Sequence, residues 1–198
     1  MGLLLSADTA PPHSSQTPSD WVRRWAHLLP PATTVLDVAC GHGRHMAWLA
    51  AQGHAVCGLD HSAEALASAR AHGEVVQADI ENGPWPLVDA AGQPRQFGAL
   101  VVTNYLWRPL FPTLLASLAP GGVLVYETFA AGNETVGKPS RPDFLLQPAE
   151  LLRLCQGLRV VAYEDGFLSN PERFVQRIVA LAPALPGGHG AAQERHPL

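Results

Sequence analysis

The stretch that decides the fold runs Val35-Leu36-Asp37-Val38-Ala39-Cys40-Gly41-His42-Gly43-Arg44-His45. Its apolar beginning predicts a strand over 34–38, and its two glycines predict a turn into a helix that ends near Gln52. A strand, a glycine turn and a helix form the first unit of an open parallel sheet. Such sheets bind ligands at the carboxyl ends of their strands, which is where this turn lies.

The same unit repeats along the chain. Residues 55–59 predict a second strand that ends at Asp60, Ser62 predicts the cap of a helix through Arg70, and residues 75–78 predict a third strand. Continuous apolar strands that alternate with helices are typical of a parallel sheet covered on both faces. We therefore expect an α/β, doubly wound fold.

The remaining segments complete this pattern. A helix with Asp20 as its cap is predicted through Leu28, because Trp21, Val22 and Trp25 recur at helical spacing before two prolines. The further predicted strands are 99–103, 123–128, 159–163 and 174–181, and the further predicted helices are 110–118 and 148–156. Residues 130–147 are irregular and polar, and we expect them to cover the site.

Composition limits the classes of protein that fit. The 198 residues suit one domain, which we place at 20–182 between a leader at 1–19 and a Gly-rich tail at 183–198. A net charge of -4 gives no general attraction to nucleic acid or anionic membranes. The apolar runs stay below the ~18 residues of a membrane span. The beginning, Met-Gly-Leu-Leu-Leu-Ser, formally matches a myristoylation signal, but so short a pattern is common by chance.

The cysteines indicate the redox compartment of the protein. Cys40, Cys57 and Cys155 are odd in number and scattered through apolar stretches, which fits reduced thiols in a cytosolic protein. We expect a cytoplasmic protein that is a monomer or a homodimer and contacts no membrane.

The residues around the glycine turn distinguish between nucleotide ligands. A dinucleotide-binding turn has a third glycine at the position of Met46. Asp37, four residues before Gly41, would repel a pyrophosphate and attract a cation. S-adenosylmethionine carries an ammonium and a sulfonium and no phosphate, and its ribose hydroxyls suit Asp60, which lies 19 residues after Gly41.

The series Asp37-x-Ala39-x-Gly41-x-Gly43, Asp60 and Asp79-Ile80 resembles the motifs of class I S-adenosylmethionine-dependent methyltransferases. The resemblance covers roughly residues 20–181 and is strongest to the small enzymes of the tellurite-resistance and thiopurine type. It implies a seven-stranded, mostly parallel sheet of order 3-2-1-4-5-7-6 with strand 7 antiparallel. It also implies S-adenosyl-L-methionine as the cofactor.

The resemblance also implies roles for single residues. The two glycines and Asp37 would meet the methionine part of the cofactor, Arg44 its carboxylate, Asp60 its ribose, and Asp79 its adenine. The residues expected to bind the cofactor are Asp37, Ala39, Gly41, Gly43, Arg44, Asp60, His61, Asp79, Ile80, Thr103 and Asn104. No metal is expected, because the histidines near the turn lack a ligand spacing.

Three residues are candidates for catalysis. Tyr105 and Arg108 follow the fourth strand, and Arg108 would either attract an anionic substrate or pair with a carboxylate. In the segment after the fifth strand we expect Asn133 or Glu134 to face the pocket, with Glu134 as the catalytic candidate. Methyl transfer is an in-line displacement, so these groups would align a nucleophile and exclude water.

The acceptor is expected to be a small molecule, such as a thiol, a selenium or tellurium oxyanion or another metabolite. Nucleic acid is not expected, because residues 103–106 lack the Asn-Pro-Pro-Tyr motif of base-methylating enzymes and no basic stripe accompanies them. Three alternatives stay open: a catalytically silent cofactor-binding or activator protein, a methyltransferase for nucleic acid or protein, and a nicotinamide oxidoreductase.

Overall fold

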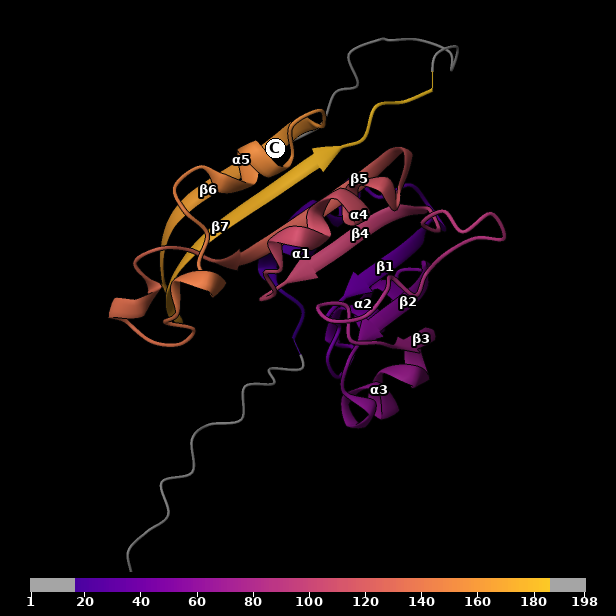
Figure 1. Ribbon diagram of the computed structural model, residues 1–198, viewed down its shortest axis with the longest axis horizontal. Coiled ribbons are helices and arrows are strands. Elements are labelled where there is room, and N and C mark those ends of the chain that lie inside the picture. The colour runs from indigo at the N-terminus through magenta and orange to yellow at the C-terminus, as the bar shows by residue number, and fades with distance from the viewer. Residues whose placement is uncertain (1–16, 186–198) are drawn as a thin grey trace, which may run out of the picture.

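A computed structural model describes residues 17–185 and contains one seven-stranded sheet of order β3-β2-β1-β4-β5-β7-β6 (Figure 1). β1 to β5 pair with one another in parallel, whereas β7 runs antiparallel to both β5 and β6. The predicted fold and strand order are confirmed. The strands are β1 (Thr34–Val38), β2 (Ala55–Asp60), β3 (Glu74–Gln77), β4 (Phe97–Thr103), β5 (Leu118–Phe129), β6 (Arg159–Ser169) and β7 (Glu172–Leu181).

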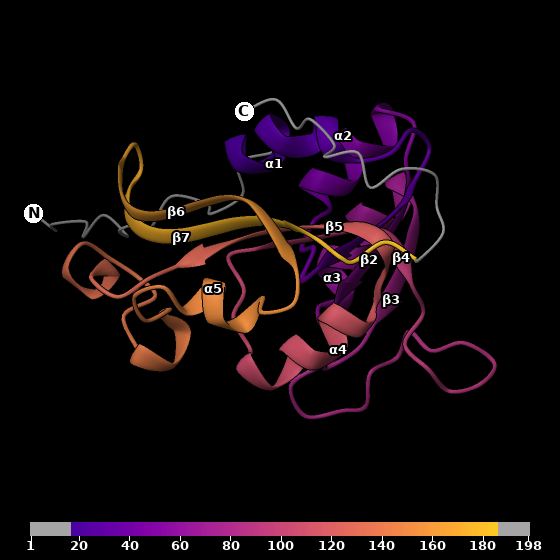
Figure 2. The ribbon, with the colours of Figure 1, turned by 90° about the horizontal axis from the view of Figure 1, so that it is seen from above.

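Helices cover both faces of the sheet (Figure 2). Helices α1, α2 and α3 share one buried cluster with Val35 and Val101, and α4 and α5 share the opposite cluster with Leu36 and Leu100. This division follows from the strand period of two, which sends neighbouring side chains to opposite faces. The helices are α1 (Asp20–Trp25), α2 (Arg44–Ala51), α3 (Ala63–Ala69), α4 (Phe111–Ala116) and α5 (Glu150–Leu154).

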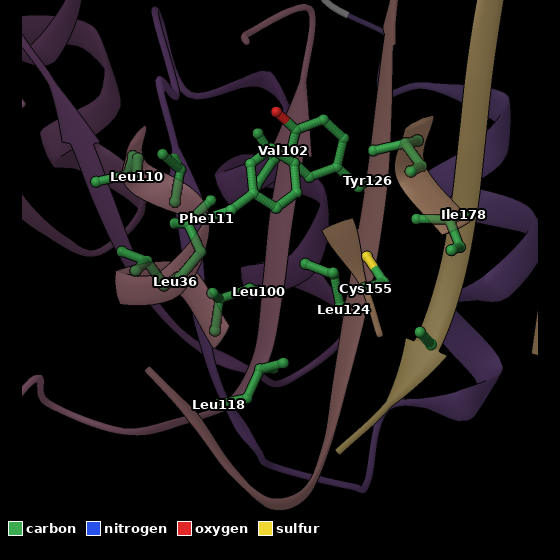
Figure 3. Packing of buried hydrophobic residues seen from close by; sticks show 14 of the residues in the cluster. Leu36, Leu100, Val102, Leu110, Phe111, Leu118, Leu124, Tyr126, Cys155 and Ile178 are labelled. Carbon is green, nitrogen blue, oxygen red and sulfur yellow. The ribbon is translucent and has the colours of Figure 1, made fainter. Parts of the chain in front are cut away.

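The face under α4 and α5 holds the larger apolar cluster (Figure 3). Leu36, Leu100 and Leu124 come from three adjacent strands, and Phe111 of α4 stacks on Tyr126 with ring centroids 5.2 Å apart. Each such side chain contributes about 1.5–3 kcal/mol when fully buried. The packing fixes the strands whose carboxyl ends carry the predicted motifs.

Several predicted boundaries differ from the observed ones. The cap of α1 is Ser19 and not Asp20, since the Ser19 hydroxyl accepts the backbone N–H of Trp21 at 3.1 Å. β6 continues to Ser169, six residues beyond its predicted end, because the hairpin partner β7 pairs with its polar second half. α4 ends at Ala116, since β5 already begins at Leu118.

The expected leader and tail lie mostly outside the described residues, as does the myristoylation-like beginning. Ser19, which the sequence assigned to the leader, is 8% exposed and packs into the domain. Within residues 17–185 no helix is long and apolar enough to cross a membrane.

Candidate active site

The carboxyl ends of β1, β2 and β4 meet at one edge of the sheet. Two residues just past these ends adopt left-handed backbone: Ala39 after β1, with φ of 54°, and Asn104 after β4, with φ of 55°. This conformation costs a non-glycine residue roughly 1–2 kcal/mol and is concentrated at functional sites. Two of the four described non-glycine residues with left-handed backbone thus lie at this edge, whereas Ala32 precedes β1 and Ala149 precedes α5.

The two glycines of the turn have different roles. Both have positive φ, 53° at Gly41 and 79° at Gly43. A Cβ on Gly43 would lie 2.8 Å from the Cα of Ala69, so this glycine lets α2 pack against α3. A Cβ on Gly41 would meet no described atom within 4 Å. The open space that a ligand needs thus lies at Gly41, and packing accounts for Gly43.

Asp60 is fixed at the end of β2 by the turn itself. One carboxylate oxygen accepts the backbone N–H of Gly41 at 2.8 Å, and the other accepts that of Ser62 at 2.9 Å. A carboxylate offers about four acceptor positions, so both oxygens keep capacity for hydroxyl donors. This is the arrangement that a ribose-binding carboxylate requires.

Asp79 is held in a similar way after β3. Its Oδ1 accepts the backbone N–H groups of Glu81 and Asn82, and its Oδ2 accepts the Asn82 amide at 2.9 Å. The hydrogen bonds from Asn82 lower the pKa of this exposed carboxyl. Asp79 is therefore an ionised acceptor in a rigid turn.

Asp37 differs from both, because it is completely buried on β1. Neither carboxylate oxygen has a hydrogen-bond partner within residues 17–185, and Nδ1 of His45 is 3.8 Å from Oδ2. Burial raises the pKa of Asp37 to about 8, although nearby Arg44 lowers it. Burial also lowers the pKa of His45 to about 3, so this ring is neutral. An unsatisfied buried carboxyl with these neighbours suits a ligand cation.

A row of polar side chains continues from Asp37 across the face under α1. Glu127 of β5 lies in register with Thr103 of β4 and Arg177 of β7. Its carboxylate accepts the Ser19 hydroxyl at 2.8 Å and Nη1 of Arg177 at 3.3 Å. The backbone N–H of Ser19 also donates to Nε2 of His45 at 3.2 Å. Ser19 therefore joins the beginning of α1 to the buried polar groups.

Two cavities open at this edge of the sheet. The first, of about 390 Å³, is lined by Ala39, Leu59, Asp60, His61, Ala78, Asp79, Ile80, Glu81, Asn82 and Tyr105. The second, of about 290 Å³, is lined by Glu81, Asn104, Tyr105, Leu106, Thr128, Phe129, Pro139 and Phe144. Glu81 and Tyr105 belong to both cavities, so the two volumes meet at these side chains.

The structure brings together part of the predicted set. The predicted residues that line a cavity are Ala39, Asp60, His61, Asp79, Ile80, Asn104 and Tyr105. Those that line neither are Asp37, Gly41, Gly43, Arg44, Thr103, Arg108 and Glu134. Among these, Arg44 lies beside the buried row, with its Nη2 3.5 Å from the Thr103 hydroxyl. Glu81 and Phe144 were missed, since neither belongs to a motif of the glycine turn.

Arg108, a candidate for catalysis, is held by an ion pair and by two backbone carbonyls. Its guanidinium donates to both oxygens of Glu150, at 2.6 and 3.0 Å, and to the carbonyls of Asp143 and Leu145. These contacts raise its pKa further, chiefly through the Glu150 hydrogen bond. Of the two readings from the sequence, pairing with a carboxylate is the one observed, and Arg108 anchors the segment before α5.

The candidates Asn133 and Glu134 lie in the segment after β5. Asn133 is 1% exposed, donates to the Pro139 carbonyl at 2.9 Å and accepts the backbone N–H of Phe174. Glu134 is exposed and accepts the backbone N–H of Gly132 at 2.8 Å. Both side chains shape the segment and neither lines either of these two cavities, so the expectation that one of them faces the pocket stays a prediction.

The sequence predicts no metal site among the histidines near the glycine turn. Across residues 17–185, no three His, Cys, Asp or Glu side chains gather in a way that would hold a metal ion.

Comparison with known proteins gives a consistent result. Residues 35–122 match the family described as a methyltransferase domain. The chain is 39% identical over 107 residues to trans-aconitate 2-methyltransferase from Paracidovorax citrulli, a match that covers 48% of this chain and 38% of that protein. The chain thus spans well under two thirds of that relative.

Solved structures share the fold. TehB from Haemophilus influenzae superposes with a TM-score of 0.65 at 19% identity, covering 82% of this chain and 61% of that one. A SAM-dependent methyltransferase from Methanosarcina mazei superposes with a TM-score of 0.64 at 15% identity, covering 85% and 100%. Residues 35–122, which match the methyltransferase-domain family, hold the glycine turn, Asp60 and Asp79, and the chain shares its fold with these solved structures.

Proposed function

We propose that the protein transfers a methyl group from S-adenosyl-L-methionine to a small-molecule acceptor. The observation that carries the proposal is the Asp60 carboxylate, which the Gly41 and Ser62 amides hold at the rim of the first cavity. A fixed carboxylate with free acceptor capacity is suited to a diol and not to a phosphate.

We assign the other binding roles from the surroundings of each residue. Asp79, ionised and held in its turn, accepts the adenine amino group, and Ile80 contacts the ring. Asp37, buried without a hydrogen-bond partner among the described residues, takes the ammonium group. Arg44, close enough to lower the pKa of Asp37, takes the carboxylate. The ammonium and the carboxylate of the cofactor then each meet an opposite charge.

When bound, S-adenosyl-L-methionine supplies a methyl group on a positively charged sulfur, open to displacement by a nucleophile. The chain's part is alignment and exclusion of water. Tyr105 lies where the cavities meet, and its backbone carbonyl is fixed by a 2.7 Å hydrogen bond from the Tyr126 hydroxyl. We propose that Tyr105 positions the acceptor at this junction.

The size of the second cavity supports a small acceptor. About 290 Å³ accommodates a metabolite of modest size and not a macromolecule. The similar protein from Paracidovorax citrulli is named for a small acceptor, trans-aconitate. We also propose that the protein is cytoplasmic, is a monomer or a homodimer, and has no nucleic-acid partner. We propose that its domain covers residues 20–182 and that Ser19 extends this domain by one residue.

Two measurements test the proposal. Titration calorimetry should show binding of S-adenosyl-L-methionine and S-adenosylhomocysteine but not of NADH, and Asp60→Asn should weaken that binding whereas surface Glu64→Gln should not. Incubation with methyl-labelled cofactor and a metabolite extract, followed by mass spectrometry, should yield a labelled product. Binding without any labelled product would support a catalytically silent protein, and NADH binding alone would support an oxidoreductase.

A further inference from the structure

The second cavity is lined by Glu81 and by three segments that lie far from it and from one another in the sequence. Asn104 to Leu106 follow β4, Thr128 and Phe129 end β5, and Pro139 and Phe144 come from the irregular segment after β5. Since it adjoins the proposed cofactor cavity at Glu81 and Tyr105, it is the place where an acceptor would bind.

The lining of this cavity carries charge of one sign. Glu81 is the charged residue of its lining, and no lining residue in the described part of the chain carries a positive charge. Arg108 is directed to Glu150 and to two carbonyls. Arg141 lies over the Phe144 ring at 5.2 Å but is paired with Asp143 at 2.8 Å. The lining therefore offers an anion no counter-charge.

The rest of the lining is mostly apolar. Leu106, Phe129, Pro139 and Phe144 present aliphatic and aromatic surface, and Phe144 remains 39% exposed. Aromatic side chains of this kind favour the burial of flat apolar groups, by stacking or edge contacts. An apolar ring suits this surface better than a small oxyanion does.

Glu81 is held in place at the junction. Its backbone N–H donates to Oδ1 of Asp79 at 3.0 Å, in the turn that also fixes Asp79. The hydroxyl of its neighbour Tyr105 is buried, and burial together with the Glu81 carboxylate raises the pKa of Tyr105. The Glu81 carboxylate and the Tyr105 hydroxyl therefore lie together where a nucleophile would approach the methyl group.

We propose, resting on the function proposed above, that the second cavity binds a neutral or cationic aromatic acceptor and that Glu81 determines this specificity. Glu81 accepts a hydrogen bond from the nucleophilic hydroxyl, thiol or amine of the acceptor and repels acceptors that carry a carboxylate or an oxyanion. The proposal distinguishes this chain from the relative named for trans-aconitate, which is a tricarboxylate.

Three phenols that differ in charge test this specificity: tyramine, which is cationic, 4-ethylphenol, which is neutral, and 3-(4-hydroxyphenyl)propionate, which is anionic. Their binding to the full chain is measured by calorimetry, with and without S-adenosylhomocysteine. Tyramine and 4-ethylphenol should bind at least about tenfold more tightly than the propionate, the size of one screened charge interaction of about 1.4 kcal/mol. Glu81→Gln should reduce this preference about tenfold, whereas Glu64→Gln should leave it unchanged.

Equal or tighter binding of the anion, the same preference in Glu81→Gln, or no binding of any phenol would overturn the proposal. The measurement does not depend on methyl transfer, so a protein that binds as expected but yields no methylated product counts against the proposed function alone. Thermal unfolding of each variant verifies that exposed Glu81 is not needed for folding.

Discussion

Replacing Asp37 by Asn should stabilise the protein, and the gain should grow with pH. The carboxyl is completely buried, and burial raises its pKa from 3.8 to about 8. The native state therefore binds more protons than the unfolded state between about pH 4 and pH 8. Stability falls as pH rises through this window, and the loss is complete above pH 8. The amide of Asn has no charge to lose.

The size of the effect follows from the two pKa values. A gap of about 4 between them corresponds to about 6 kcal/mol above pH 8, of which about 4 kcal/mol develops between pH 5 and pH 8. His45 acts in the opposite direction below about pH 6.5, because its pKa is lowered to about 3. It is present in both proteins, so the difference in stability between variant and wild type isolates Asp37.

Urea unfolding followed by tryptophan fluorescence at pH 5, 6.5 and 8 measures this difference. The free energy of unfolding of Asp37→Asn minus that of the wild type should increase by about 4 kcal/mol from pH 5 to pH 8. The surface variant Glu64→Gln serves as the control and should show no such trend. A difference that stays flat with pH, or an Asn variant less stable than the wild type at pH 8, would refute the argument.

Three further predictions concern neighbouring features. A ligand cation favours the ionised form of Asp37, so the affinity for S-adenosyl-L-methionine should rise with pH. Calorimetry should show a rise of up to about tenfold per pH unit below pH 8 and no further rise above it. Gly43→Ala should lower the free energy of unfolding by about 3 kcal/mol, because the added Cβ clashes with Ala69. Gly41→Ala should lower it by about 1 kcal/mol and should act mainly on cofactor affinity. Equal losses of stability would contradict the separate roles of the two glycines. Arg108→Met should cost about 2 kcal/mol in chemical denaturation by leaving the Glu150 carboxylate without its partner, and an unchanged midpoint would contradict the anchoring role.

The residues of the glycine turn could be predicted because their partners are close in sequence or in regular register. The position of Asp60 follows from the apolar strand that it ends. Its hydrogen bond from the backbone N–H of Gly41 connects the ends of two adjacent parallel strands, β1 and β2. Such local geometry repeats in every doubly wound sheet. The Asp60 side of the first cavity could therefore be predicted from the sequence, whereas the sheet order was implied by the resemblance to class I methyltransferases.

The acceptor side could not be predicted in the same way. The partner of Arg108, Glu150, lies 42 residues further along the chain, so the sequence could not distinguish a catalytic arginine from an anchor. Glu134 was selected because it is polar and lies in an irregular segment, and the sequence could not indicate that its carboxylate accepts the backbone N–H of Gly132. Glu81 lies in a turn whose relation to Phe144 depends on how three distant segments fold together.

Ser19 has a consequence for the dynamics of the chain. If α1 separated from the sheet, Glu127 and His45 would each lose a hydrogen bond, and the indole of Trp21 would lose its contact with the carbonyl of Ile178. A helix of six residues at the beginning of a domain would ordinarily fray independently. Here α1 should open only together with the central strands, as a member of the same cooperative unit.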